Sequence, residues 1–309
     1  MTALLRSGTL RIMQASVARP VHLKVPDGPG PFPVHLLLHG RGSSGSRILG
    51  RWSNPANMWS SISRTHVLVA PDGVDQSWNI VGEPSRQDDV SFVIEILDRL
   101  SSFSNVDAGC VQLFGFSNGA GLVNRILIEC DDRRIVRAVT DSSQLNQKQY
   151  RDNTFYVGGD DNGYSVVKQT LIPSFGAACA LALDQLASSL VVRELISLQG
   201  LKDELILADG GETTLPGIVM NSDAISIHAF ATAYGYTRPP QPARRVSSDG
   251  CSFKYWAYEV PSLHAPLKSY TVEHAGHGVM GTCAEVDEIV TEFFGGVKDR
   301  VVLIESSYE

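Results

Sequence analysis

The pattern of apolar and polar residues along the chain predicts buried strands that alternate with amphipathic helices. Continuous apolar runs, typical of strands covered on both faces, occur near residues 34–38, 67–70, 111–114, 135–139 and 155–157. Helical spacing of apolar residues follows possible N-caps at Asp88, Ser222 and Thr282, and also follows Ser117. Strands that alternate with helices at this spacing indicate parallel βαβ units. We therefore expect an α/β fold with a mostly parallel central sheet flanked by helices.

The two ends of the chain and one long central segment depart from this alternation. Alternating residues near 10–12 and 21–25 predict an N-terminal hairpin, and residues 269–272 predict the last strand. Residues 164–267 contain helical patterns but no regular strand–helix order. We expect one domain over residues 1–309, in which 164–267 is an inserted region that covers the pocket.

The most informative motif lies between the strand near 111–114 and the helix that follows it. Gly115-Phe116-Ser117-Asn118-Gly119 separates the two elements. Strand, Gly-x-Ser-x-Gly and helix in this order form the nucleophile elbow of the α/β-hydrolase fold. The tight turn holds the serine oxygen above the sheet at a helix N-terminus, where negative charge is favoured. Ser117 is therefore the predicted nucleophile.

A serine nucleophile needs a base, and in this fold the base is a histidine in the loop after the last strand. His274 and His277 both lie there, and we prefer His277 because Gly276 and Gly278 free its backbone. His228 falls inside a predicted helix and His264 in a polar connection, so neither is preferred.

The acid that orients the base should follow a strand between the serine and the histidine. Asp161 is our first choice, since it follows the strand near 155–157 in a glycine-containing turn. Asp160 is the second candidate, and Asp141, after the preceding strand, is the third. Aspartate is common in ordinary turns, so only position supports this choice.

The turn after the strand near 34–38 supplies the expected oxyanion hole. His39-Gly40-Arg41-Gly42 ends that strand, and a glycine-flanked turn there can direct a backbone N–H at the nucleophile. We expect the N–H groups of Arg41 and Asn118 to bind the oxyanion.

Several of these motifs together resemble one esterase family. Leu38-His39-Gly40, Ser77-Trp78-Asn79, Asp88-Asp89-Val90 and the Gly-x-Ser-Asn-Gly elbow are similar to motifs of polyhydroxybutyrate depolymerases, feruloyl esterases and acetylxylan esterases. The resemblance implies a serine esterase that acts on short-chain, hydroxyalkanoate or hydroxycinnamate-type esters. It also implies that His39, Gly40 and Trp78 contact the substrate.

Composition and charge bear on which binding partners the protein is expected to have. The chain has 309 residues, is 43% hydrophobic, and carries a net charge of −7, so nothing attracts its surface to nucleic acid or anionic lipid. No apolar run approaches the roughly 20 residues of a membrane span. We expect no metal and no cofactor, because no ligand cluster or phosphate-binding glycine loop occurs. The sequence does not indicate an oligomeric state.

The cysteines and the N-terminus bear on location. There are five cysteines, and an odd number without tight spacing argues against a disulfide framework, although Cys251 and Cys283 could pair. The first 20 residues lack the apolar centre of a secretory signal. We expect a cytoplasmic protein, with a secreted or mitochondrial location left open.

The predicted function is a serine carboxylic-ester hydrolase that works through an acyl-enzyme. Two alternatives stay open: a non-catalytic binding protein of the same fold, and an acyltransferase or thioesterase that uses the same triad. An enzyme based on a reactive cysteine is a weaker hypothesis, because Cys-x-x-Cys is absent.

Overall fold

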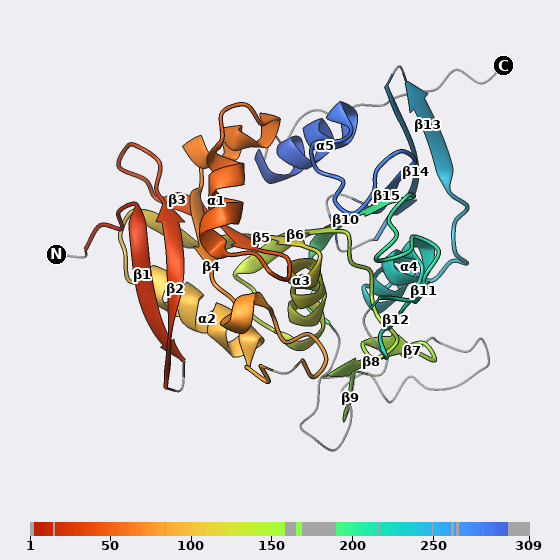
Figure 1. Ribbon diagram of the computed structural model, residues 1–309, viewed down its shortest axis with the longest axis horizontal. Helices are drawn as coiled ribbons and strands as arrows, with labels where there is room; N and C mark the ends of the chain where they lie inside the picture. The colour runs from red at the N-terminus through yellow and green to blue at the C-terminus, as the bar shows by residue number, and fades with distance from the viewer. Residues whose placement is uncertain are drawn as a thin grey trace.

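A ten-stranded mixed sheet runs through the molecule (Figure 1). This computed structural model describes residues 3–295 except 15, 84, 158–164, 169–189, 215–216, 249, 261–262 and 264–265. The spatial order is β1-β2-β4-β3-β5-β6-β10-β15-β14-β13. Neighbours from β4 to β15 pair in parallel, whereas β1, β2, β13 and β14 are antiparallel additions at the two edges.

The strands of this sheet have the following bounds: β1 Gly8–Gln14, β2 Val17–Lys24, β3 Phe32–Leu38, β4 Val67–Pro71, β5 Val106–Phe116, β6 Ile135–Asp141, β10 Glu194–Gly200, β13 Arg244–Ser248, β14 Cys251–Tyr258 and β15 Leu267–Val272. The predicted N-terminal hairpin is present as β1 and β2. The predicted α/β fold, with a mostly parallel central sheet flanked by helices, is confirmed.

Helices cover both faces of the sheet and form two hydrophobic cores. In the described residues the helices are α1 Gly45–Ser53, η1 Met58–Arg64, η2 Val74–Gln76, α2 Asp89–Leu100, α3 Asn118–Glu129, α4 Asp223–Ala233 and α5 Ala284–Gly295. Apolar residues of α2, α3 and α4 share one core, and those of α1, η1 and α5 share the other. Successive strand residues point to opposite faces, so Leu36 and Leu38 of β3 join the first core and Leu37 joins the second.

Two expectations about the middle of the chain are wrong. The run near 155–157 forms β8 Thr154–Val157, which pairs antiparallel with β7 Tyr150–Arg151 and β9 Ser165–Lys168 in a separate small sheet. Residues 164–267 are also not one insertion. β10 lies between β6 and β15 in the central sheet, and β13 and β14 form its edge. Among the described residues of this segment, shorter pieces such as β11 Gly211–Glu212, β12 Val219–Met220 and α4 lie outside that sheet.

One disulfide joins the edge of the sheet to the last helix. Cys251 at the start of β14 is bonded to Cys283, which directly precedes α5. Cys110 and Cys130 are free thiols. In the part of the chain that the structure describes, no helix combines the length and the apolar character that crossing a membrane requires.

Candidate active site

Ser117 lies in a sharp turn between β5 and α3, as the motif predicts. Its backbone has φ 52° and ψ −118°, a conformation that residues other than glycine rarely adopt. Gly115 and Gly119 are required by close approach, since a methyl group on Gly119 would lie 2.2 Å from the carbonyl oxygen of Leu38. The turn thus presents the hydroxyl of Ser117 at the N-terminus of α3, above the carboxyl ends of the parallel strands.

His277 lies in the loop after β15 and contacts Ser117 directly. Its Nε2 is 2.8 Å from the Oγ of Ser117. Its Nδ1 is 2.8 Å from the Oδ2 of Asp203. The ring of Phe116, the residue before the serine, packs against the imidazole with centroids 5.4 Å apart. An ionised Asp203 can only accept at Nδ1, which therefore carries the proton and leaves Nε2 free to accept from the serine hydroxyl.

Asp203 follows β10 by three residues and is held by four donors. Its Oδ1 accepts from the backbone N–H groups of Leu205 and Ile206 at 2.9 and 3.0 Å. Its Oδ2 accepts from the Nε2 of Gln199 at 2.8 Å as well as from His277. Burial raises the pKa of this carboxyl, but the hydrogen bonds from His277 and Ile206 outweigh it, and the net pKa is lowered. Asp203 is therefore an ionised, rigidly oriented acceptor.

Asp203 is the residue that sequence reasoning missed. Asp161 and Asp160, the preferred candidates, lie outside the described residues. The available signal was the apolar run of β10 followed by Gly200 and, three residues later, Asp203. The exposed His274 is turned away from the site, with its Nε2 2.8 Å from the carbonyl oxygen of Thr282.

Asp141, the third candidate for the acid, holds the loop that carries His277 and does not bond to the imidazole. It is fully buried, and its carboxylate accepts from the backbone N–H groups of Val279 and Met280 at 2.9 and 3.2 Å. Next to it, the Oγ of Ser142 accepts from the N–H of Gly278 at 2.8 Å. Burial raises the pKa of Asp141, and these hydrogen bonds lower it in part. The end of β6 thus fixes the loop that carries His277.

The turn after β3 approaches the nucleophile closely. A methyl group on Gly40 would lie 3.3 Å from the Cβ of Ser117 and 2.9 Å from the ring of Phe116. The imidazole of His39 donates from Nδ1 to the carbonyl oxygen of Gly40 and accepts at Nε2 from the N–H of Gly73. Among the described residues, the backbone N–H of Arg41 has no acceptor. Asn118 is the first residue of α3, so its N–H also has no partner within the helix.

Trp78 is completely buried, contrary to the expectation that it contacts a substrate. Its indole Nε1 donates to the carbonyl oxygen of His39 at 2.8 Å. Its backbone N–H donates to the Oδ1 of Asn118 at 2.7 Å, and its carbonyl oxygen accepts from the Nδ2 of the same residue. Asn79 continues the network through a backbone N–H bond to Asp89. These motif residues brace the turn at Gly40 against the elbow.

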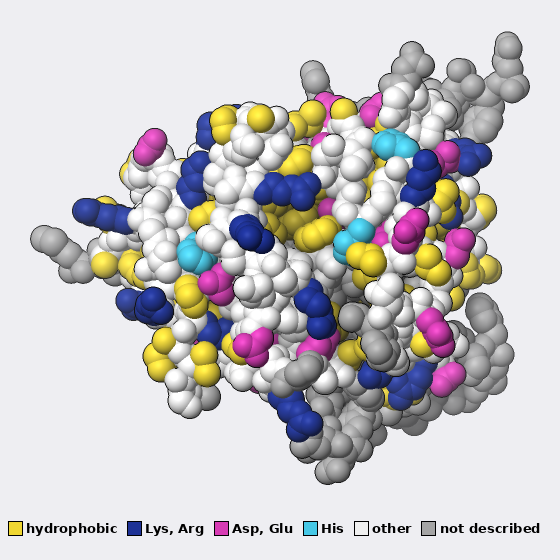
Figure 2. All heavy atoms as spheres, in the orientation of Figure 1, with side chains coloured by type: hydrophobic (Ala, Val, Ile, Leu, Met, Phe, Trp, Pro, Cys, Tyr) yellow, Lys and Arg dark blue, Asp and Glu magenta, His cyan; other side chains and the backbone are white. Residues whose placement is uncertain are grey.

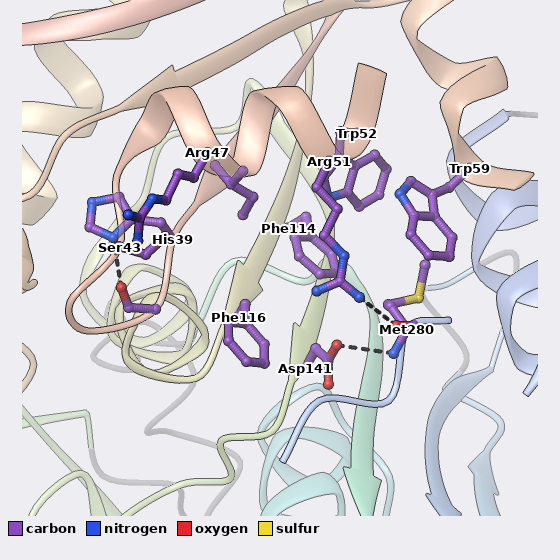
Figure 3. A pocket seen from close by; sticks show the side chains of 12 residues that line it. His39, Ser43, Arg47, Arg51, Trp52, Trp59, Phe114, Phe116, Asp141 and Met280 are labelled. Atoms are coloured by element: carbon purple, nitrogen blue, oxygen red, sulfur yellow. Dashed lines mark hydrogen bonds between the residues drawn. The ribbon is translucent and has the colours of Figure 1, made fainter. Parts of the chain in front are cut away.

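A cavity of about 170 Å³ opens beside the nucleophile turn (Figure 3). Its walls include Gly40 and Phe116 at the elbow, aromatic residues, and two arginines of α1; the lining residues are His39, Gly40, Ser43, Arg47, Ile48, Arg51, Trp52, Trp59, Phe114, Phe116, Asp141 and Met280. His39 and Gly40, expected to contact a substrate, both line this cavity. Figure 2 shows a hollow on this face with hydrophobic side chains at its floor and basic side chains at its rim.

Metal-binding residues are scarce in the described part of the chain. One group of suitable side chains occurs there, Cys251, Cys283 and Glu285, and its two sulfurs are joined in the disulfide. That group lies outside the Ser117–His277–Asp203 cluster, in which His277 bonds to both Ser117 and Asp203. The geometry assembled here is that of a hydroxyl, an imidazole and a carboxylate in series.

Comparison with solved structures shows the fold. No protein-family model matches the sequence, and no curated protein resembles it significantly. The acetyl xylan esterase from Aspergillus awamori superposes with a TM-score of 0.58 at 13% identity, over 93% of this chain and 99% of that one. Thermogutta terrifontis esterase 2 phosphonylated by cyclosarin gives a TM-score of 0.52 at 11% identity, over 94% of each chain. The same esterase phosphorylated by paraoxon gives 0.50 at 12% identity, over 94% of this chain and 91% of that one.

Proposed function

We propose that this protein is a serine carboxylic-ester hydrolase that works through an acyl-enzyme. The observation that carries the proposal is the pair of 2.8 Å contacts that His277 makes, one from Nε2 to Ser117 and one from Nδ1 to Asp203. A hydroxyl, a correctly oriented neutral imidazole and an ionised carboxylate are the three parts that activate a serine at neutral pH.

The reaction follows from the hydrogen bonds of the site. As the Oγ of Ser117 attacks the ester carbonyl carbon, its proton moves to the Nε2 of His277. Asp203 stabilises the imidazolium through Nδ1. The imidazolium then gives the proton to the oxygen of the leaving alcohol, and an acyl group remains on Ser117. Water attacks this acyl group with His277 again as base, which releases the acid and restores the serine.

The tetrahedral intermediate places negative charge on the former carbonyl oxygen. The backbone N–H groups of Arg41 and Asn118 are the proposed donors for this oxyanion, because they flank Ser117 and have no acceptor among the described residues. In this proposal Gly40 is required by space, since any side chain there would meet Phe116 and Ser117. The Trp78–Asn118 hydrogen bonds keep the two donors at a fixed separation.

The esterases with a similar fold support the general reaction class. One of them is described as an acetyl xylan esterase, and another as an esterase phosphorylated by paraoxon. We propose that short acyl esters are accepted here too, and that an organophosphate such as paraoxon traps the nucleophile. Hydroxyalkanoate or hydroxycinnamate esters are the finer possibilities that the motif resemblance favours.

Labelling with paraoxon or a fluorophosphonate tests the proposal. We expect one stoichiometric adduct, and peptide mapping by mass spectrometry should place it on Ser117. The Ser117→Ala variant should take no label and should lose hydrolysis of p-nitrophenyl acetate by at least about 10⁴-fold. A stoichiometric adduct on another residue, or hydrolysis that survives in Ser117→Ala, would show that the proposed nucleophile is wrong.

A further inference from the structure

The cavity beside Ser117 contains two arginines on one face of a helix. Arg47 and Arg51 are four residues apart on α1, so their side chains leave the same side of the helix. Both are exposed, and both line the cavity (Figure 3). Two like charges at this spacing repel each other, and the repulsion opposes helix formation. An arrangement that costs stability in the free protein is explained if an anion binds between the two groups.

No salt bridge to an acidic residue is made by either guanidinium in the described residues, although the charge of Arg51 partly offsets the rise in pKa that burial causes at Asp141 and Asp287. Arg51 donates to the carbonyl oxygen of Met280 at 2.5 Å and lies over the ring of Trp59 at 5.7 Å from its centroid. The side chain of Arg47 makes no ion pair or hydrogen bond to any described residue. Arg51 extends toward Met280 and Asp141, whereas Arg47 extends toward His39 and Ser43 (Figure 3). Their remaining N–H donors are free for a ligand.

Asp141 is the only acidic residue among those that line the cavity. Its carboxylate already accepts from the backbone N–H groups of Val279 and Met280 and from the hydroxyl of Ser142. Even when ionised it supplies one negative charge against the two arginines; burial raises its pKa, and Arg51 is among the groups that lower it. The charged groups that face the cavity therefore give it a net positive charge. Its walls include the aromatic residues Trp52, Trp59 and Phe114.

The cavity lies where the acid part of an ester must go. The alcohol that leaves has to lie against the Nε2 of His277, which gives it a proton. Gly40 of the oxyanion turn and Phe116 of the elbow line the cavity, and from the loop that carries the base, Met280 lines it but His277 does not. The volume of about 170 Å³ is similar to the roughly 150 Å³ apolar cavity that holds benzene in another protein, so one ring or a short chain fits.

We propose that the acid part of the preferred substrate carries a second, negatively charged carboxylate, which Arg47 and Arg51 bind. The substrate class is then a monoester of a dicarboxylic acid with a short aliphatic or single-ring spacer. This inference rests on the proposed esterase function, since it concerns only which ester Ser117 attacks. Arginine suits the task because its planar donor fork matches a carboxylate.

The first test compares two esters that differ only in charge. Mono-p-nitrophenyl adipate carries the carboxylate, and p-nitrophenyl 6-oxoheptanoate has a methyl ketone in its place. We expect kcat/KM to be at least about tenfold higher for the adipate, as for a charge-assisted hydrogen bond. Added salt should reduce this preference, because the arginines are exposed. A ratio of one or below would overturn the inference.

Variants of the two arginines make the test specific. Arg47→Gln combined with Arg51→Gln should lower the adipate-to-ketone ratio by about 10- to 100-fold. Arg47→Gln alone is informative even if Arg51→Gln disturbs Met280, because Arg47 has no contact with that loop in the described structure. Arg11→Gln, an exposed site on β1, is the control for loss of one positive charge and should leave the ratio unchanged. An unchanged ratio in the double variant would also overturn the inference.

A second ester pair and a neutral ester separate the remaining outcomes. 3-Acetoxybenzoate and 3-acetoxyacetophenone differ by a carboxylate in the alcohol part. A preference found only in this pair would place the anion on the other side of the ester and overturn the assignment to the acid part. If p-nitrophenyl acetate is hydrolysed through Ser117 without any preference for anionic esters, only this inference fails. If hydrolysis does not depend on Ser117, the proposed function fails with it.

Discussion

At the scale of single residues, the proposed mechanism requires the contact between His277 and Asp203, because it orients the imidazole as a base. Replacing Asp203 by Asn would let His277 adopt the other tautomer, with its proton on Nε2. In a serine protease triad the same change lowers turnover by about 10⁴-fold. We predict a loss of about 10³- to 10⁴-fold in kcat on p-nitrophenyl acetate, with the melting temperature close to that of the wild type.

Two other aspartates serve as controls for this prediction. Asp161→Asn should change kcat by less than about tenfold, since Asp203 already occupies the position next to Nδ1. Asp141→Asn should instead lower the melting temperature, because its amide would face the N–H donors of Val279 and Met280. If Asp161→Asn is inactive and Asp203→Asn is active, the acid has been assigned to the wrong residue.

The sequence was sufficient to select Ser117 and His277, which the structure brings into contact, but not Asp203 beside them. Ser117 is marked by a local motif, and His277 by glycines in the loop after the last strand. Asp203 depends on where β10 lies, and β10 enters the sheet between β6 and β15 only through long-range pairing. The same limit applies to Trp78, because a motif does not reveal whether its indole faces solvent or a buried carbonyl oxygen.

At the scale of elements, the loop that carries Trp78 braces the turn after β3, which holds the proposed oxyanion donor Arg41. Trp78→Phe keeps most of the buried ring but removes the donor to the carbonyl oxygen of His39. A buried acceptor left without a partner costs about 1–3 kcal/mol of folding free energy. We predict a loss of that size in the free energy of unfolding, measured with urea. We also predict that kcat falls by the same factor for every ester tested.

A matched tryptophan distinguishes this role from substrate contact. Trp256 lies on β14, and its indole nitrogen makes no hydrogen bond to a described residue, so Trp256→Phe should cost less stability. An effect of Trp78→Phe that appears only as a higher KM for large esters would mean that the ring does contact substrate, contrary to its burial.

The disulfide links the edge strand β14 to the start of α5, just after the loop that carries His277. Cys251 and Cys283 are 32 residues apart, and closing a loop of this size stabilises a protein by about 2–4 kcal/mol. We predict that Cys251→Ser with Cys283→Ser lowers the free energy of unfolding by about that amount, whereas Cys110→Ser changes it little. Urea unfolding of the three proteins measures the difference.

Counting thiols in the denatured, unreduced protein tests whether this bond forms. Three of the five cysteines should react with Ellman's reagent if it does, and all five if it does not. Disulfides persist in oxidising compartments, so a count of three would also argue against the cytoplasmic location expected from the sequence. Spacing alone left this pair undecided, because strand β14 and its edge position were not visible in the local pattern.

Element prediction was reliable where the local pattern coincides with burial. Strands β3, β4, β5, β6 and β15 are continuous apolar runs or end in a recognisable turn, and the structure contains each of them. The run at β8 is equally apolar, yet it pairs with β7 and β9 outside the central sheet. Short apolar runs show that a strand is buried but not which sheet buries it.

At the scale of the whole molecule, buried titratable groups set how stability depends on pH. His66 is buried and its pKa is lowered to about 4, chiefly by desolvation. Desolvation by burial also raises the pKa of Asp223, to about 7. The unfolded values are about 6.5 for histidine and about 3.9 for aspartate. The two groups therefore act in opposite directions between pH 4 and 7.

The signs follow from which state binds more protons. Between pH 6.5 and 4 the unfolded chain protonates His66 and the folded protein does not, so this group lowers stability as pH falls. Between pH 7 and 4 the folded protein keeps Asp223 protonated and the unfolded chain does not, so this group raises stability as pH falls. Each effect is at most about 1.4 kcal/mol per pH unit, and the two partly cancel.

Removing one group at a time should therefore change the slope of the unfolding free energy against pH in opposite directions. Relative to the wild type, His66→Gln should gain stability as pH falls from 7 to 5, because it no longer takes up a proton on unfolding. Asp223→Asn should instead lose relative stability over the same fall, since the wild type alone gains from the protonated carboxyl. Urea unfolding of the three proteins at pH 7, 6 and 5 measures both slopes. Equal slopes in all three proteins would mean that neither side chain is titrated as its burial requires.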